Sequence, residues 1–170
     1  MPDDGIPWDM PLASSAEGLI LEATRNRLRG LGLPGIQQER IVIQSLAWMP
    51  DPVEFPPPYV IISPAPETTP WQEGTNERDV AYFAAVISVV LANARDLTRG
   101  MGLQLYWRER IRRKFQCKSI ATFTELTFTD NTQLIQTIIE SGDKFIEAAK
   151  RDQRDAQYYV VRFKVREPRD

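Results

Sequence analysis

Apolar residues at helical spacing predict a first helix close to the N-terminus of the chain. It is expected to begin near Ser14 or Ser15, because Ser14 and Glu17 have the spacing of a capping box. Gly30 and Pro34 are expected to end it. The apolar stripe that would face the core recurs along one side of this helix, at Leu19, Ile20, Ala23, Leu28 and Leu31.

Three stretches rich in apolar and β-branched residues then predict three strands. Residues 41–48 and 59–63 are the first two, and they are expected to pair antiparallel across the proline-rich segment 49–58. Residues 80–92 are the third, long and apolar enough to lie in the centre of a sheet. Residues 64–79 are predicted to form a long polar loop, whose length is typical of a functional or interaction loop.

A second helix is predicted after the central strand, with Asp96 or Thr98 as its N-cap. Gly100 and Gly102 are expected to weaken its first turn. Apolar residues recur in it at every fourth position and are expected to face the core, namely Leu103, Trp107, Ile111 and Phe115.

The last third of the chain shows three further patterns. Residues 120–129 alternate threonine with apolar residues, which predicts a strand with one polar face. Residues 132–150 carry an apolar stripe at helical spacing, which predicts one bent helix or two short helices, with Asp143 capping the second. Residues 158–165 are predicted to be the last strand, with its arginine and lysine side chains on one face and its apolar side chains on the other.

These elements predict an α+β fold: a mixed, mainly antiparallel sheet of about five strands with two or three helices packed on one face. Residues 1–13 are expected to form an irregular N-terminal arm, because three prolines limit helix and sheet formation there. Residues 14–170 are expected to form a single domain, as the chain length of 170 residues favours.

Composition excludes several kinds of chemistry. The chain has no histidine and one cysteine, Cys117, so it cannot supply a Ser-His-Asp triad, a Cys-His pair, a His-ligated zinc site or an internal disulfide. The formal charge of −2 argues against a generally cationic nucleic-acid coat or a polybasic membrane binder. No secretory signal is visible, and the longest apolar stretch, residues 80–92, is shorter than the ~20 residues of a membrane span. We therefore expect no enzyme, no cofactor, no metal and no membrane partner.

The most distinctive charge feature is the segment 108–118, which carries six basic residues and one acidic residue. On the second helix these basic residues would surround the core-facing positions. Three interpretations are open: a solvated helix face, an ion-pairing face toward an acidic neighbouring subunit, or a nucleic-acid-facing patch, which the net charge disfavours. The candidate contact residues are Arg108, Arg110, Arg112, Arg113 and Lys114.

The predicted loop 64–79 carries charge of the opposite sign. Its glutamates include Glu73 and Glu77, set against Arg78 as the one basic residue, and Trp71 lies among them. Trp71 is either a partner anchor or a residue tucked under its own loop. Trp8 in the arm likewise either packs back onto the domain or anchors the arm to a neighbouring subunit. An acidic loop and a basic helix on one chain suit a heterologous, head-to-tail ring.

Several segments together resemble tailed-phage tail-terminator (tail-completion) proteins and related proteins encoded in phage-like gene clusters. They are the end of the first helix at Leu33-Pro34-Gly35-Ile36, the strands 41–48 and 59–63, the loop 75–79 leading into the strand from Val80, the helix segment 107–112, and the closing stretch 160–169. The resemblance covers residues 16–119 and 143–170.

The resemblance implies a structural virion protein without catalytic residues. Such a subunit forms a homo-oligomeric ring, a hexamer, that caps the tail tube and joins it to the neck. Its partners would be the tail tube protein below and a head-completion or neck protein above, with DNA passing through the lumen without specific binding. It would be assembled in the host cytoplasm and reside in the tail or neck of the virion. The first alternative is a head-closure or neck adaptor ring protein. The second, which ranks lower, is a nucleic-acid-binding accessory protein.

Overall fold

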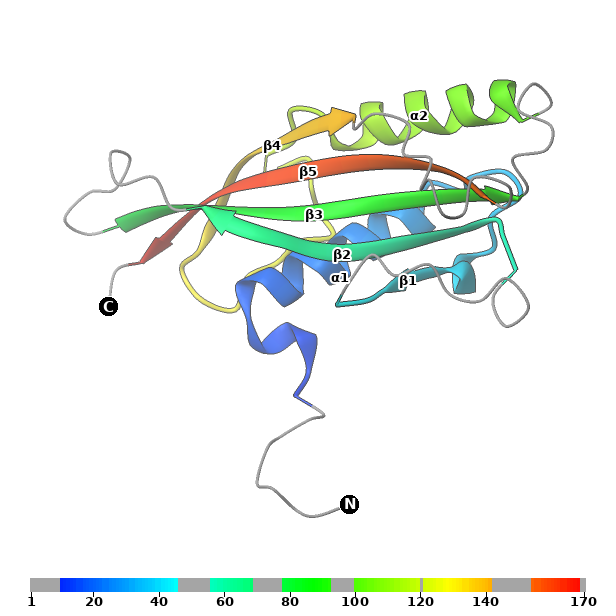
Figure 1. The fold of residues 1–170 in the computed structure, drawn as a ribbon. Coiled ribbons are helices and arrows are strands. Elements are labelled where there is room, and N and C mark those ends of the chain that lie inside the picture. Colours follow the sequence, from blue (N-terminus) through cyan, green and yellow to red (C-terminus); the bar gives the residue numbers. More distant parts are fainter. Residues whose placement is uncertain are drawn as a thin grey trace, which may run out of the picture.

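The computed structural model describes residues 10–45, 56–68, 78–92, 100–119, 121–141 and 154–168. Five strands form a single sheet in the order β1-β2-β3-β5-β4 (Figure 1). The helices and strands are η1 Leu12–Ser14, α1 Ala16–Arg29, η2 Gln38–Arg40, β1 Ile41–Ile43, β2 Tyr59–Thr68, β3 Arg78–Ala92, α2 Met101–Phe115, β4 Gln133–Ser141 and β5 Arg154–Pro168.

The predicted α+β class is confirmed. The β2–β3, β3–β5 and β4–β5 pairs are antiparallel and the β1–β2 pair is parallel, so the sheet is mixed and mainly antiparallel. Both helices bury side chains in one large core against the same face of the sheet, where Ile20 and Leu28 of α1 join Trp107 of α2 and Phe163 of β5. The main core therefore lies between the sheet and the two helices.

Strand β3 occupies the centre of the sheet, as its length and apolar character predict. It pairs over its whole length with β5, from Arg78 with Pro168 to Ala92 with Arg154. Its residues from Val80 to Val90 are mostly buried on both faces. The prediction for its neighbour β5 is also confirmed: Val161, Phe163 and Val165 are fully buried, and the basic residues alternate with them on the other face.

The predicted antiparallel pairing of the first two strands is wrong. Ile41 pairs with Val60 and Ile43 with Ile62 in a parallel register. A parallel pair needs a connection of about a dozen residues or more, and residues 44–58 supply that length. The long connection thus serves as a crossover and not as a hairpin loop.

The predicted loop 64–79 is shorter than the sequence suggested. Residues 64–68 continue β2, where Pro64 pairs with Ala85 and Thr68 with Tyr82, and residues 78–79 begin β3. A register shift between Ala65 and Thr68 lets the proline-containing end of β2 stay paired. The connection between β2 and β3 therefore consists of residues 69–77.

The predicted strand over 120–129 is wrong, and so is the predicted helix from residue 132 as far as residue 141. The rest of that helical prediction, residues 142–150 with the Asp143 cap, lies outside the described residues. Residues 121–132 form turns, and residues 133–141 form strand β4. Leu134, Thr137 and Ile139 face the core, paired with inward-facing residues of β5, and a bulge after Leu134 changes the spacing from strict alternation. The apparent helical stripe combined apolar residues of both faces, since Ile138 is 38% exposed while Leu134 is buried. The β-branched side chains of the segment favour a strand.

The predicted start of α1 near Ser14 or Ser15 is confirmed, but the predicted cap on Ser14 is wrong. Ser15, not Ser14, is the N-cap, and its hydroxyl accepts a hydrogen bond from the backbone N–H of Gly18 at 3.0 Å. Ser14 belongs to η1, which also takes up the last residues of the predicted arm. The turn of η1 fits closely against α1, because a Cβ at position 18 would lie 1.7 Å from the carbonyl oxygen of Leu12.

Candidate interaction surface on helix α2

Helix α2 is fixed rigidly to the rest of the molecule by its inner face. Trp107, Ile111 and Phe115 are buried, as their spacing predicted. The indole Nε1–H of Trp107 also donates a hydrogen bond to the carbonyl oxygen of Pro34 at 3.1 Å. The helix begins at Met101 with Gly100 as N-cap, so the predicted caps Asp96 and Thr98 are wrong; a Cβ at position 100 would lie 2.5 Å from the side chain of Leu91.

A buried arginine on α1 secures the C-terminal end of α2. The guanidinium of Arg27 donates to the carbonyl oxygens of Lys114 and Thr122 and pairs with the Glu125 carboxylate at 2.5 Å. It also lies over the ring of Phe123, 4.2 Å from the ring centroid. Its side chain is only 4% exposed, so this charge belongs to the core and not to a binding surface.

A buried polar network secures the N-terminal half of α2. The Tyr159 hydroxyl donates to Gln157 Oε1 at 2.6 Å, and Gln157 Nε2 donates to Gln104 Oε1 at 3.1 Å. Burial raises the pKa of Tyr159 to about 12, against a smaller opposing effect of the Arg108 charge. The phenol therefore stays protonated and able to donate at physiological pH.

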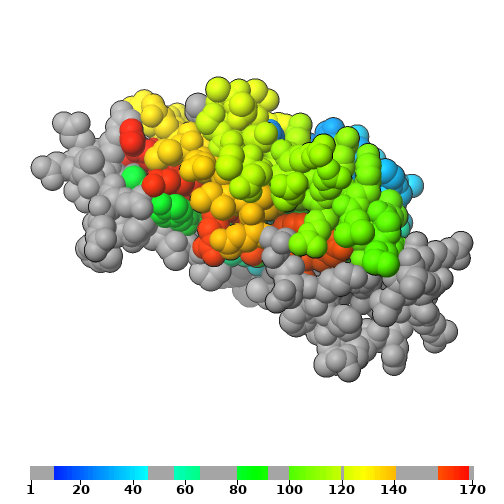
Figure 2. Space-filling view, turned by 90° about the horizontal axis from the view of Figure 1, so that it is seen from above, coloured from blue at the N-terminus to red at the C-terminus, as the bar shows by residue number. Residues whose placement is uncertain are grey.

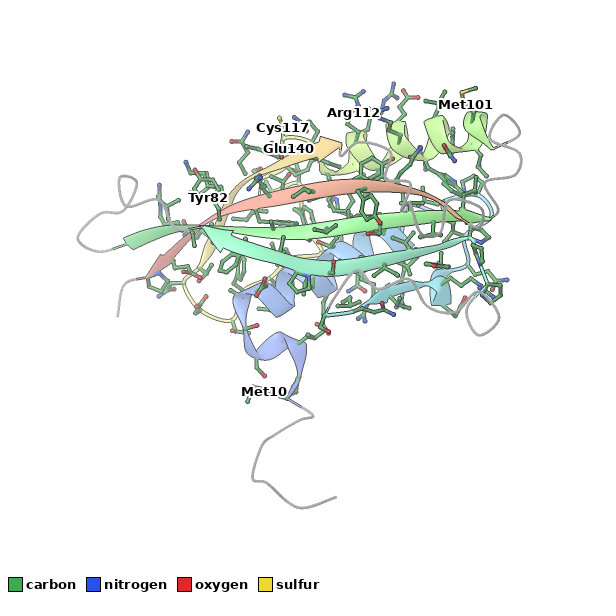
Figure 3. All side chains as sticks on the ribbon, viewed as in Figure 1. Met10, Tyr82, Met101, Arg112, Cys117 and Glu140 are labelled. Atoms are coloured by element: carbon green, nitrogen blue, oxygen red, sulfur yellow. The ribbon has the colours of Figure 1, made fainter. Side chains whose placement is uncertain are left out.

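The outer face of α2 has an apolar half and a cationic half. Met101, Leu105 and Tyr106 in its first half are 48%, 54% and 44% exposed. These three residues are half of the large exposed hydrophobic side chains in the described part of the chain, so the apolar exposure is concentrated here. The second half of the same face carries the exposed arginines of the segment 108–113 (Figure 3). We call these exposed residues, Met101, Leu105, Tyr106, Arg108, Glu109, Arg112 and Arg113, the outer face of α2.

The five predicted basic residues of α2 lie in different environments. Arg108 and Arg112 are exposed one turn apart, and Arg113 forms an exposed i,i+4 ion pair with Glu109. Arg110 is also exposed, but it donates from Nη2 to the carbonyl oxygen of Leu31 at 3.0 Å, and Lys114 is half-buried. The structure thus brings Arg108, Arg112 and Arg113 together on the outer face and uses Arg110 in part to hold the turn after α1.

In Figure 2, α2 runs along the surface of the molecule beside β4. The segment that follows α2 shields the edge strand, because Cys117 and Lys118 exchange backbone hydrogen bonds with Thr137 of β4. The outer face of α2 and not the β4 edge is therefore the feature that this side of the molecule offers to a partner.

The remaining predicted contact residues lie largely outside the described residues. Trp8, Trp71, Glu73 and Glu77 fall in the ranges that the structure does not describe. Arg78 is described for its backbone alone, as the first residue of β3. The apolar half of the outer face was missed by the sequence interpretation, although Met101 and Leu105 are one turn apart and lie outside the core-facing stripe.

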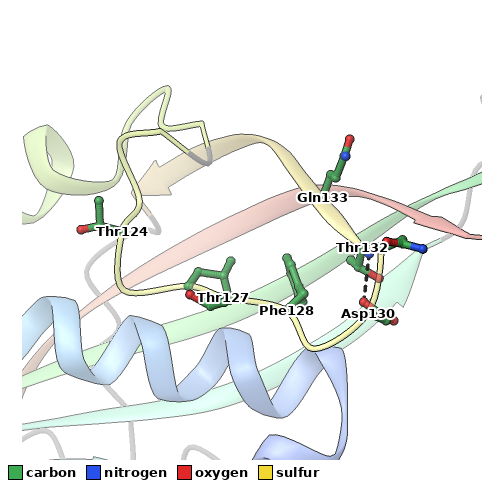
Figure 4. A pocket seen from close by; sticks show the side chains of 8 residues that line it. Thr124, Thr127, Phe128, Asp130, Thr132 and Gln133 are labelled. Atoms are coloured by element: carbon green, nitrogen blue, oxygen red, sulfur yellow. Dashed lines mark hydrogen bonds between the residues drawn. The ribbon is translucent and has the colours of Figure 1, made fainter.

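A separate hollow of about 460 Å³ lies beside the segment that precedes β4 (Figure 4). The backbone N–H of Thr132 donates to Asp130 Oδ1 at 2.9 Å, which closes a local turn. The lining comes from this one segment and the first residue of β4, namely Thr124, Leu126, Thr127, Phe128, Asp130, Asn131, Thr132 and Gln133. Within the described ranges, no group of three or more His, Cys, Asp or Glu side chains is arranged to hold a metal ion, here or elsewhere.

Comparisons with known proteins add no identification. No family model matches the chain, and no curated protein matches it. Among the described helices, none has the length and apolar character required to cross a membrane.

Proposed function

We propose that this chain is a structural subunit of a tailed-phage particle, a tail-terminator-like protein that forms a ring at the head-proximal end of the tail tube. In this role it stops tube growth and joins the tail to the neck. The chain acts through contact surfaces and not as an enzyme.

The outer face of α2 carries this proposal. Exposed apolar side chains beside exposed arginines, on a helix whose other face is locked into the core, are typical of a contact surface for another protein. Solvation alone does not account for Met101, Leu105 and Tyr106 lying together in the exposed first half of α2. A subunit that joins a tube to a neck needs such faces and needs no catalytic group.

The placement of the segments that carry the resemblance gives further support. The stretch Leu33–Ile36 and the helix segment 107–112 lie far apart in the sequence, yet Trp107 donates to Pro34. Arg110 donates to Leu31 just before that stretch. Two of the segments that carry the resemblance therefore form one contact unit behind the outer face of α2.

Deletion of the gene from its phage or phage-like cluster tests the proposal. We expect tail tubes that grow beyond their normal length and fail to join heads, because nothing ends polymerisation. An epitope-tagged copy should restore normal tails and place a single layer of label at the head-proximal end in negative-stain images. Tails of normal length in the deletion strain, with no label on any particle, would refute a virion role.

The same experiment separates the alternatives. Tails of normal length that fail to join heads, with twelvefold rings in images of the purified protein, would favour a head-closure or neck adaptor. Steeply salt-dependent binding of the purified protein to DNA would favour a nucleic-acid-binding accessory protein.

A further inference from the structure

The outer face of α2 requires a partner with two matching properties. One stripe along the outer face runs Met101, Leu105, Arg108 and Arg112, spaced four, three and four residues apart, so an apolar end continues directly into a cationic end. A complementary segment must place an aromatic or aliphatic side chain beside carboxylates and carry no basic residue of its own.

Residues 69–77 of this chain have that composition. The sequence Thr-Pro-Trp-Gln-Glu-Gly-Thr-Asn-Glu contains Trp71, Glu73 and Glu77 and no lysine or arginine. Its two ends are held by the paired ends of β2 and β3, since Thr68 pairs with Tyr82 and Arg78 pairs with Pro168. A segment fixed at both ends loses less conformational entropy on binding than a segment fixed at one end.

The apolar end of the outer face is out of reach of Trp71 in the same copy. The N-terminus of α2 lies at the far end of β3, where Gly100 packs against Leu91. Thr68 is paired with Tyr82, nine residues from Leu91 along the strand, a distance of about 30 Å. Trp71 reaches at most about 10 Å from Thr68. Figure 3 shows Tyr82 and Met101 near opposite ends of the molecule.

We propose that the outer face of α2 binds residues 69–77 of a second copy of this chain. Trp71 of one copy covers Met101 and Leu105 of the next, and Glu73 and Glu77 face Arg108 and Arg112. Because the segment 69–77 and the apolar end of the outer face lie toward opposite ends of each chain, the contact is head-to-tail and repeats from copy to copy. This inference rests on the proposed function, for which it names the subunit contact.

Two charge-reversal variants test the contact. The helix variant carries Arg108→Glu and Arg112→Glu, and the segment variant carries Glu73→Arg and Glu77→Arg. Each alone puts like charges on both surfaces, so each is expected to lose the oligomer seen with the wild type in light scattering. Glu39→Arg, an exposed site on η2, is the charge control and should assemble like the wild type.

The mixture of the two variants gives the sharpest result. In alternating order, every contact between a helix variant and a segment variant joins opposite charges again, so an equimolar mixture is expected to regain the wild-type oligomer mass. The inference is overturned if the segment variant assembles like the wild type, if the mixture stays dissociated, or if the wild type is monomeric at every concentration up to 1 mM.

Two other segments of the chain combine tryptophan with carboxylates, residues 1–9 and 46–55. A chain that lacks residues 1–9, and a separate Asp51→Arg, Glu54→Arg variant, are both expected to assemble like the wild type. Loss of assembly in either one, with normal assembly of the segment variant, would assign the outer face of α2 to that segment instead. Over-long tails in the deletion strain would leave the proposed function intact in that case, so the two failures are distinguishable.

Discussion

The inner and outer faces of helix α2 look alike in the sequence and differ completely in the structure. Both contain large apolar side chains at helical spacing and both border arginines. On the inner side, Trp107 and Phe115 are 1% exposed or less, and the guanidinium of Arg27 is buried against Phe123. On the outer side, Leu105 is 54% exposed beside the exposed Arg112. The inner face maintains the fold, and the outer face is available for a partner.

The largest expected effect comes from removing the central residue of the inner face. Trp107→Ala should lower the free energy of unfolding by about 3–5 kcal/mol, because it leaves a cavity and frees the Pro34 carbonyl from its hydrogen bond. Urea denaturation measures this. Tyr106→Ala is the matched control on the outer side, with an expected change within about 0.5 kcal/mol. Equal losses in the two variants would abolish the distinction between the faces.

Removal of the buried arginine should have the next largest effect. Arg27→Met is expected to cost about 3 kcal/mol, since it leaves Glu125 and two carbonyl oxygens without their donor. Arg25→Met, in the same helix turn, removes only a partly exposed ion pair with Glu22 at 3.8 Å and should cost less than about 1 kcal/mol. If the two arginines proved equivalent in denaturation, the description of Arg27 as a core residue would be incorrect.

The buried tyrosine under α2 gives a pH-dependent effect. The pKa of Tyr159 is raised to about 12 by burial, while an unfolded tyrosine titrates near 10. Between these values the unfolded chain binds fewer protons than the native one, so stability falls as pH rises. We expect wild type to lose about 1 kcal/mol more than Tyr159→Phe between pH 10 and pH 11. Parallel stability curves for the two proteins would contradict this.

The smallest effect on stability is expected from the outer face itself. Leu105→Ser and Arg112→Glu should each change the free energy of unfolding by less than about 0.5 kcal/mol, measured at a concentration where light scattering gives the monomer mass. Both variants should nevertheless weaken assembly. A large loss of stability in either would mean that the outer face is part of the core packing.

The sequence predicted the elements in which the apolar pattern reflects burial in the core alone. The central strand β3, the last strand β5 and the inner stripe of α2 each bury a regular set of side chains, so periodicity alone identified them. Predictions failed where the spacing of apolar residues fitted both a helix and a strand, or where pairing between distant segments decided the direction of a strand. Apolar residues on both faces of β4, such as the buried Leu134 and the exposed Ile138, give the segment a helix-like spacing. The direction of the β1–β2 pair depends on a crossover that local residues do not encode.

The candidate site was predicted in part. The basic residues of α2 were evident from their density, but the sequence could not tell that Arg110 binds the Leu31 carbonyl. Nor did it reveal the apolar half of the outer face, because Met101 and Leu105 are exposed only through the rotation that Trp107 and Ile111 impose on the helix. That rotation is a result of tertiary packing.

The most direct test of a role for the outer face in assembly is the solution mass of the purified chain and of its Arg108→Glu, Arg112→Glu variant. We predict that light scattering gives about six times the 19.5 kDa chain mass for the wild type, with rings in negative-stain images. The variant should give the monomer mass at an unchanged melting temperature. A variant that assembles as well as the wild type, or a wild type that is monomeric and absent from any particle, would contradict the account.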